Sequence, residues 1–188
     1  MRSVTYSMGV SLDGYIQDAD GDINWGEPDE EVFRFAIEET RRVGVHLLGR
    51  RLYETMLYWE GMEQDPTLDP PTREWVELWN PLPKVVFSRT LTEVRGRARL
   101  AGGSLAEEIA RLRAEPGEGE IALGGAALAA EAAAADLIDE YRIRVSPVLL
   151  GDGTPFFAQD GRRVKLELVE SRTFRSSQVV YLRYRVAR

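Results

Sequence analysis

The sequence predicts an α/β protein with a mostly parallel central sheet and antiparallel strands at its C-terminal end. Short, continuously apolar segments such as GVHLLG (44–49) alternate with helical segments along about three quarters of the chain, as in sheets buried on both faces. Residues 140–151 and the pair of segments within 163–187 instead alternate apolar and polar side chains with a period of two. That period is typical of antiparallel strands, and the last two segments predict a hairpin.

Composition limits the classes of protein that the chain can represent. Its 188 residues are 44% hydrophobic and 29% charged, which predicts one globular domain over 1–188. The net charge of -7 argues against nucleic acid as a partner. No apolar run approaches the ~20 residues of a membrane span. The N-terminus lacks a secretory pattern, so we expect a cytoplasmic protein without membrane contact.

The first sixty residues predict, in order, a strand, a loop, a helix, a strand and a helix. The strand covers 3–16, with Asp13 and Gly14 as residues suited to a turn, and a polar loop follows. Pro28 and acids in the first turn open a helix through about Arg42. Val32, Phe35, Ala36 and Glu39 share the spacing of one helical face. The second strand and helix are 44–49 and 50–59.

The remainder continues the alternation. A proline-rich loop precedes a short helix that ends at Asn80, and Ser104 with Glu107 forms a capping-box pattern at another helix start. The alanine-rich stretch after Gly125 has high helix propensity and predicts a helix to about residue 139. Strands are expected at 83–89, weakly at 98–103, and at 121–125.

The sequence gives little indication of catalysis by histidine or cysteine, or of a metal site. The chain has no cysteine, and its one histidine, His46, lies inside an apolar strand, where a packed core histidine is expected. A zinc site would lack its usual ligands. The many acids leave an all-carboxylate magnesium site open, but they show no recognisable ligand spacing. We therefore predict no metal.

Three predicted parallel strands end in residues that suit an anion. Gly49 is followed by Arg50 and Arg51, Ser88 by Arg89, and Gly124-Gly125 by the alanine-rich helix. Ligands of open α/β sheets bind at this edge, and arginine suits phosphate. Taken singly, surface arginines and tight turns explain each feature. Together they predict a ligand with several phosphates, such as a dinucleotide with a 2′-phosphate, although the usual glycine-rich nucleotide fingerprints are absent.

Five segments together resemble the dihydrofolate reductase superfamily over essentially the whole chain. They are YSMGVSLDGYI, LLGRRLYE, VVFSRTL, IALGGAAL and LIDEYRIRVSPVLLGDGTPFF. The closest branch is the reductase domain of the riboflavin-biosynthesis deaminase–reductase with its stand-alone relatives. The resemblance implies a dihydrofolate-reductase-like, three-layer α/β/α sandwich with an eight-stranded sheet, and NADPH as cofactor. It implies hydride transfer to a small heterocyclic or carbonyl substrate, with 5-amino-6-(5-phosphoribosylamino)uracil as one candidate.

The resemblance also implies a set of cofactor-binding residues. Backbone groups of the first strand and one apolar side chain would meet the nicotinamide, and the three strand ends would meet the phosphates and the ribose. A loop at Gly151, Asp152 and Gly153 would lie near the substrate. The cofactor set is Met8, Gly9, Ile16, Gly49, Arg50, Arg51, Ser88, Arg89, Gly124, Gly125, Ala126 and Leu128. Leu52 departs from the family pattern, which has a small hydroxyl residue in contact with phosphate.

The catalytic and substrate residues are less determined by the resemblance. Folate reductases place one carboxylate on the first helix, and here Glu27, Asp29 and Glu30 crowd its start, where the helix dipole alone also favours acids. Asp29, Glu30 and Tyr15 are the candidate catalytic residues. Candidate substrate-binding residues are Trp25, Asp13 and Arg144. Arg144 shares a predicted strand face with Arg142, and exposure at a sheet edge would explain both arginines.

Two other classes of function remain open. The chain could bind NADP without turnover, as a sensor or partner module, or it could be an interaction protein on a borrowed fold. Relatives of this branch also imply a homodimer, for which the final hairpin offers apolar residues.

Overall fold

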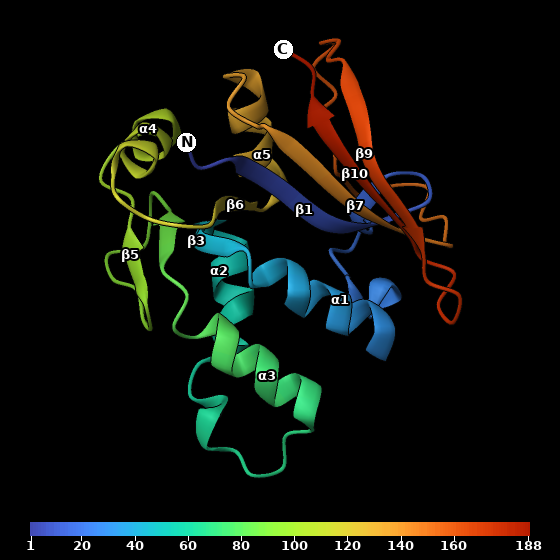
Figure 1. Cartoon of the computed structure of the whole chain (residues 1–188), viewed down its shortest axis with the longest axis horizontal. Helices are drawn as coiled ribbons and strands as arrows, with labels where there is room; N and C mark the ends of the chain where they lie inside the picture. Colours follow the sequence, from blue (N-terminus) through green and yellow to red (C-terminus); the bar gives the residue numbers. More distant parts are fainter.

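The computed structural model describes all 188 residues and shows one eight-stranded sheet between two layers of helices (Figure 1). The strand order is β5-β4-β3-β6-β1-β7-β10-β9. Every neighbouring pair from β5 to β7 is parallel, and β10 alone runs against its neighbours β7 and β9. The predicted fold class, a mostly parallel sheet that ends in antiparallel strands, is confirmed.

The bounds of the elements follow. The sheet consists of β1 (Val4–Ser11), β3 (Val43–Gly49), β4 (Lys84–Phe87), β5 (Ala98–Leu100), β6 (Glu120–Gly124), β7 (Glu140–Ser146), β9 (Leu166–Thr173) and β10 (Val180–Val186). The α-helices are α1 (Glu30–Thr40), α2 (Arg50–Met56), α3 (Pro70–Trp79), α4 (Leu105–Ala114) and α5 (Ala126–Ala134). Three 3-10 turns are η1 (Asn24–Gly26), η2 (Leu57–Trp59) and η3 (Met62–Gln64), and β2 (Tyr15–Gln17) pairs with β8 (Thr154–Pro155) in a separate ribbon.

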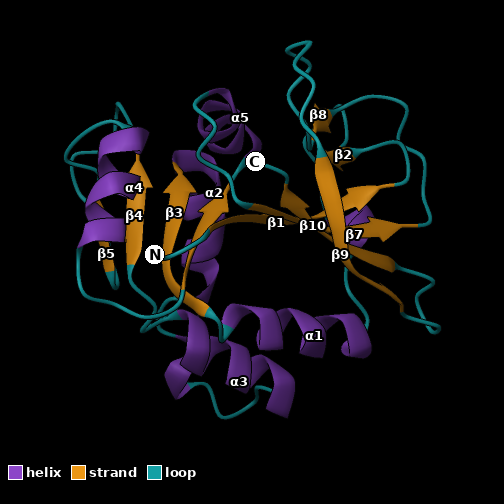
Figure 2. Ribbon diagram, turned by 45° about the horizontal axis from the view of Figure 1, so that its top comes forward, coloured by secondary structure: helices purple, strands orange, loops and turns teal.

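The two faces of the sheet differ in what covers them (Figure 2). On the face covered by α4 and α5, here called the α5 face, 19 buried side chains form a continuous apolar core. On the opposite face, here called the α1 face, helices α1, α2 and α3 pack over two smaller apolar clusters around Trp79 and Phe174. Between these clusters the α1 face is lined by charged side chains, which are buried on β7 and half-buried on β6 and β10.

Several local predictions hold, and two need correction. The capping box of α4 is present, with Ser104 and Glu107 each bonded to the other's backbone. The helix after Gly125 ends at Ala134, not at 139, because Asp136 adopts a left-handed φ of 52° that stops it. The single strand expected over 3–16 is instead two strands, β1 to Ser11 and β2 from Tyr15, because the turn at Asp13-Gly14 separates them. The pairing of β2 with β8 was not predicted, since strands of three and two residues carry too little periodicity.

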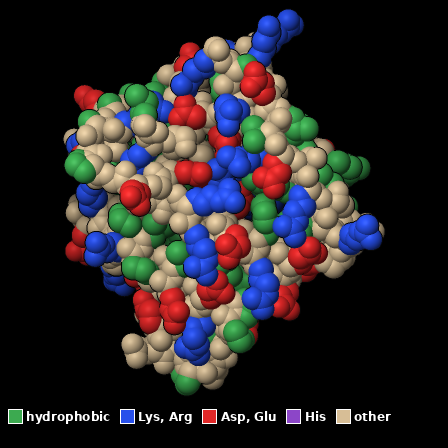
Figure 3. Space-filling model, viewed as in Figure 1, with side chains coloured by type: hydrophobic (Ala, Val, Ile, Leu, Met, Phe, Trp, Pro, Cys, Tyr) green, Lys and Arg blue, Asp and Glu red, His purple; other side chains and the backbone are tan.

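The expected edge exposure of Arg142 and Arg144 is wrong. Their strand β7 lies between β1 and β10, inside the sheet, and Arg142 is only 2% exposed. The predicted shared face is correct, since both arginines contact Glu39 of α1. On the outer surface, by contrast, Lys and Arg side chains are interspersed with Asp and Glu (Figure 3). The buried charges of β7 therefore call for a different explanation from those of the surface.

Candidate functional site

The sheet register brings the three predicted strand ends together at one edge. Gly49 of β3 lies opposite Phe87 of β4, the residue before Ser88, and Leu48 lies opposite Gly124 of β6. Three neighbouring strands therefore end side by side at Gly49, Ser88 and Gly125. This is the carboxyl edge of the parallel strands, where ligands of open α/β sheets bind.

Gly125 combines a special backbone conformation with free space. Its φ of 103° is one that side chains with a Cβ rarely adopt, and a Cβ built there meets no atom within 4 Å. No side chain caps the helix α5 that follows, and its first turn carries no acidic residue. The backbone at this position can therefore approach a ligand closely.

Gly124 is bare for a different reason. A Cβ there would lie 2.6 Å from Cδ2 of Leu52 and 2.8 Å from Cδ2 of Leu48. It would also lie 2.9 Å from Cε1 of His46. Side chains of the protein already fill the space beside Gly124, and Leu52, the residue that departs from the family pattern, is one of them. Free space belongs to Gly125.

The arginines of this edge differ in their partners. Arg50 pairs with Glu54 one turn later, with Nη1 and Oε1 3.6 Å apart. Arg51 and Arg89 are exposed and form no ion pair. The Ser88 hydroxyl accepts hydrogen bonds from the backbone N–H groups of Thr90 and Leu91, at 3.1 and 3.0 Å. Two unpaired guanidinium groups thus flank the strand ends, and Ser88 shapes the turn that carries one of them.

The other predicted cofactor residues lie on both faces of the sheet. Ile16 and Leu128 are buried in the apolar core of the α5 face, and Met8 and Ala126 pack against it. Gly9 faces the α1 side, where the nearest atom to a built Cβ is the Arg144 carbonyl oxygen at 4.0 Å. Gly9 therefore leaves open backbone beside β7.

Comparison with known proteins identifies the family. The chain matches the family described as the RibD C-terminal domain over residues 2–180. It belongs to that family.

Relatives and solved structures of similar fold agree with this membership. The uncharacterized protein YyaP of Bacillus subtilis (strain 168) is 30% identical over 184 residues, which cover 96% of this chain and 94% of YyaP. A crystal structure from Shewanella sp. PV-4, assigned by name to riboflavin biosynthesis, has a TM-score of 0.78 and 26% identity, with both chains fully covered. Dihydrofolate reductase from Enterococcus faecalis, solved with NADP(H), has a TM-score of 0.62 and 15% identity, with 99% and 97% covered. The chain is therefore a RibD C-terminal domain with a dihydrofolate-reductase-like fold.

Hydrogen bonds connect Asp13, in the turn after β1, with the loop that contains Gly151 and Gly153. Asp13 accepts hydrogen bonds from the Ser11 hydroxyl at 2.6 Å and from the backbone N–H groups of Leu150 and Gly151, the latter at 2.7 Å. The bond from Ser11 and then that from Gly151 lower the pKa of Asp13 to about 2. Gly153 has no room for a Cβ, which would lie 1.9 Å from the Gln17 carbonyl oxygen. The structure thus places Asp13 and this loop in a mutual anchor.

The candidate catalytic carboxylates are engaged at the start of α1. Asp29 caps the helix by accepting from Val32 N–H at 2.9 Å, and it also accepts from the Ser176 hydroxyl at 2.6 Å. Glu30 pairs with Arg34 on the surface, 2.9 Å away. Tyr15 and Trp25 are half-buried in β2 and η1, and the Trp25 indole donates to the Asp22 carbonyl oxygen.

The carboxylate of α1 that does reach the sheet is Glu39, which the sequence-based candidates did not include. Its side chain is 8% exposed and accepts from Arg144 and from Tyr181 of β10. The signal was present in the sequence, because Glu39 shares the helical face of Val32, Phe35 and Ala36. An acid on the apolar face of a helix indicates a buried partner.

Two hollows of the molecule lie away from this edge of the sheet. A hollow of about 560 Å³ lies between the end of α5 and the end of β10, and one of about 320 Å³ lies on the outer side of α1. Neither is lined by a predicted cofactor residue. No group of three His, Cys, Asp or Glu side chains is placed to bind a metal ion. No helix combines the length and the apolar character needed to cross a bilayer.

His46 is half-buried inside β3, with its Nδ1 atom buried, and it makes stability depend on pH. Burial lowers the pKa of its imidazole from 6.5 to about 4, and its ring stands edge-on to Trp79. The unfolded chain therefore binds an extra proton between pH 6.5 and pH 4, so stability is complete above this window and falls as the pH drops through it. This pKa difference corresponds to about 3 kcal/mol. We expect urea unfolding of His46→Phe to show a smaller loss of stability from pH 7 to pH 4 than the wild type shows, and equal losses would contradict the assignment.

Proposed function

We propose that this protein is an NADPH-dependent reductase that transfers hydride to a small heterocyclic or carbonyl compound. The observation that carries the proposal is the meeting of Gly49, Ser88-Arg89 and Gly125 at the carboxyl edge of three neighbouring strands. A free backbone at Gly125 and unpaired guanidinium groups at Arg51 and Arg89 match a ligand that carries several phosphates. Bound NADPH would supply the hydride, and the chain would supply position and electrostatics.

Each part of the edge has a distinct role in this proposal. The backbone of Gly125 and the first turn of α5 would lie against the pyrophosphate. Arg51 and Arg89 would hold phosphate groups, with Arg89 and Ser88 on the side of the 2′-phosphate. Arg50 would contribute less, because Glu54 already balances its charge. Leu52 offers no hydroxyl, so backbone and arginine contacts would have to replace the hydrogen bond that the family pattern supplies.

The relatives support the choice of cofactor and of substrate class. The Enterococcus faecalis reductase of the same fold is a complex with NADP(H), and the Shewanella protein is assigned by name to riboflavin biosynthesis. An aminopyrimidine such as 5-amino-6-(5-phosphoribosylamino)uracil is therefore the first substrate to test. The proposal places Met8 and Gly9 at the nicotinamide, and the substrate between α1 and the sheet.

A second candidate function is NADP binding without turnover. The observation that favours it is the engagement of Asp29 and Glu30 with other residues. Of the three candidate catalytic residues, this leaves Tyr15 as a proton source. NADPH oxidation with a panel of pterins, aminopyrimidines and small carbonyl compounds separates the two. Binding of NADPH with no oxidation by any compound would favour the sensor or partner module.

The proposed cofactor predicts a preference that depends on arginine. We expect titration followed by NADPH fluorescence to show tighter binding of NADPH than of NADH. The variant Arg51→Gln/Arg89→Gln should lose at least tenfold in affinity for NADPH, since one hydrogen bond to a charged group contributes about 1.5–3 kcal/mol. Arg34→Gln is the matched control, because Arg34 is a surface arginine paired with Glu30 on α1. Preference of the wild type for NADH, or equal NADPH affinities in both variants, would contradict the proposal.

The proposal includes a homodimer formed through the final hairpin. Strand β9 is the edge of the sheet, and its Leu168 and Val169 are 56% and 41% exposed. An edge strand with unpaired backbone groups and exposed apolar side chains is suited to a second copy of the chain.

A further inference from the structure

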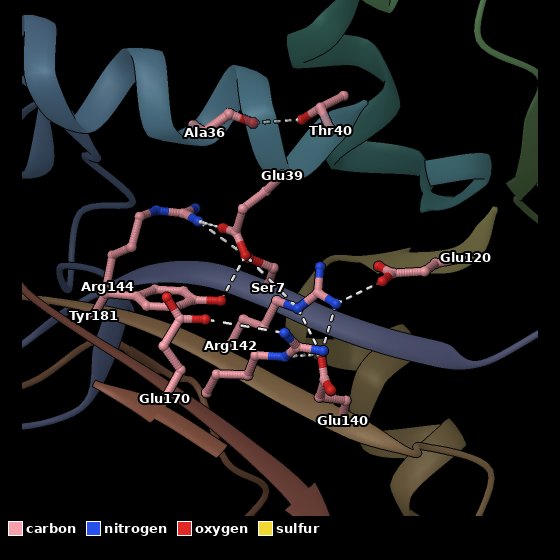
Figure 4. A network of polar contacts seen from close by, with 11 residues as sticks. Ser7, Ala36, Glu39, Thr40, Glu120, Glu140, Arg142, Arg144, Glu170 and Tyr181 are labelled. Carbon is pink, nitrogen blue, oxygen red and sulfur yellow. Dashed lines mark hydrogen bonds and ion pairs between the residues drawn. The ribbon is translucent and has the colours of Figure 1, made fainter. Parts of the chain in front are cut away.

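The buried charges of the α1 face converge on Glu39, at the last turn of α1 (Figure 4). Its Oε1 accepts a hydrogen bond from the Tyr181 hydroxyl at 2.8 Å, and its Oε2 accepts from Nη1 of Arg144 at 2.9 Å. Nε of Arg142 lies 3.6 Å from Oε1. One carboxylate is thus shared between two guanidinium groups, and burial together with Glu39 raises the pKa of Tyr181, which keeps that hydroxyl protonated as a donor.

Arg142 and Arg144 differ in how completely they are paired. Arg142 lies between Glu120 and Glu140, with contacts of 2.7 and 2.6 Å, in addition to Glu39. Arg144 has no acidic partner other than Glu39. Glu39 is thus the one carboxylate that Arg144 contacts, and Arg144 shares it with Arg142.

Arg144 uses only one side of its guanidinium group. Nη1 donates to Glu39 and to the Ser7 hydroxyl at 3.0 Å, which fixes the plane of the group. Nε and Nη2 donate no hydrogen bond within the protein, and neither is among its buried unpartnered atoms, so this edge reaches solvent. The N–H bonds of Nε and Nη2 point in the same direction, and this two-donor edge matches the two oxygens of a carboxylate or phosphate.

The position of this edge connects it with the proposed reductase site. Arg144 pairs with Gly9 in the β1–β7 register, and both face the α1 side of the sheet. Because Gly9 has no side chain, nothing but the Arg144 carbonyl oxygen comes within 4.0 Å of a Cβ built at Gly9. A ligand that lies over Gly9 would therefore lie beside Arg144, its neighbour in the sheet.

We propose that the Nε–Nη2 edge of Arg144 is an oxyanion-binding site on the α1 side of the sheet, and that Glu39, Ser7 and Tyr181 are positioning residues that hold its guanidinium group in place. The ligand class is a small molecule with a carboxylate or phosphate group. That this ligand is the substrate rests on the proposed reductase function. The oxyanion site itself stands on the geometry of β1, β7 and α1.

The test is NMR observation of arginine Nε–H groups in ¹⁵N-labelled protein, titrated with inorganic phosphate and, separately, with acetate at constant ionic strength. The Arg144 signal is the one that is missing from the spectrum of Arg144→Lys. We expect this signal to move in a saturable way with one or both anions, and the two titrations show which oxyanion the site prefers. Arg144→Lys keeps the charge but lacks the two-donor edge, so we expect phosphate affinity, followed in both proteins through the backbone amide signal of Gly9, to fall at least tenfold.

Two controls keep this result separate from the cofactor site. Phosphate should still shift the Arg144 signal in Arg51→Gln/Arg89→Gln, and Arg172→Gln, a substitution on β9, should leave the shift unchanged. NADPH binding by Arg144→Lys tests the reductase proposal independently, because no cofactor phosphate is assigned to Arg144. An Arg144 signal that neither anion moves would overturn the oxyanion site, whatever the NADPH titration shows.

Discussion

Replacement of Gly125 with leucine is expected to abolish NADPH binding in a protein that still folds. The open space beside Gly125 is where the cofactor pyrophosphate is proposed to lie, and a leucine side chain would occupy it. A non-glycine residue at a φ of 103° costs of order 1–3 kcal/mol, less than the 5–15 kcal/mol that ordinarily stabilises a domain. We expect NADPH affinity to fall by more than a hundredfold in a fluorescence titration, with an unchanged far-UV circular dichroism spectrum.

The matched control for this substitution is Gly161→Leu. Gly161 also has a positive φ, 73°, and a Cβ built there meets no atom within 4 Å, but the residue lies in the loop before β9. It therefore reproduces the backbone strain without entering the proposed site. Undiminished NADPH binding by Gly125→Leu would show that Gly125 serves only the turn between β6 and α5.

Arg142→Met is expected to cause the largest loss of stability of any substitution discussed here. Burial disfavours the charge of Arg142, but Glu120 and Glu140 hold its pKa above the ordinary value, and it is the buried partner of both. Removal of one member of a buried ion pair leaves uncompensated charge and costs about 3–5 kcal/mol. We expect urea unfolding at pH 7 to report a loss of this size in the free energy of unfolding.

Two further variants show whether the loss comes from burial. Arg34→Met breaks a pair whose side chains are 53% and 71% exposed, so we expect a change of about 1 kcal/mol or less. Adding Glu120→Gln to Arg142→Met removes the carboxylate whose only ion-pair partner was Arg142 and should restore part of the stability, whereas Glu140 keeps Arg183. If Arg142→Met costs no more than Arg34→Met, the network on the α1 face is not the buried ionic cluster described here.

The positions of the strand ends in the candidate site could be predicted from the sequence, but the residues that surround them in space could not. Gly49, Ser88 and Gly125 each follow an apolar strand, and parallel strands place their carboxyl ends at one edge, so local pattern and fold class were enough. The period of two put Arg142 and Arg144 on one face but could not tell that β10 would cover the edge of β7. That pairing joins residues far apart in the chain, and it makes the difference between an exposed edge and a buried network.

At the start of α1 the local sequence could not decide the roles of the acidic residues. Acids at a helix N-terminus are favoured by the dipole whether or not they serve a ligand, so Asp29 and Glu30 were ambiguous in the sequence. The structure gives each of them a local partner. Glu39 was marked by its place on an apolar helical face, but its partners Arg144 and Tyr181 come from β7 and β10, and only the folded chain brings them together.

The anchor between Asp13 and the Leu150–Gly151 backbone has an evolutionary consequence. It joins two segments 138 residues apart, on either side of the loop that runs from Asp18 toward α1. Each end of this loop is held by hydrogen bonds. The β2–β8 pairing holds the first end, and the cap of α1 holds the second. Substitutions and changes of length within the loop can accumulate without transmitting strain to the glycine and arginine edge. Variation in the loop before α1 is thereby separated from the edge formed by Gly49, Ser88 and Gly125.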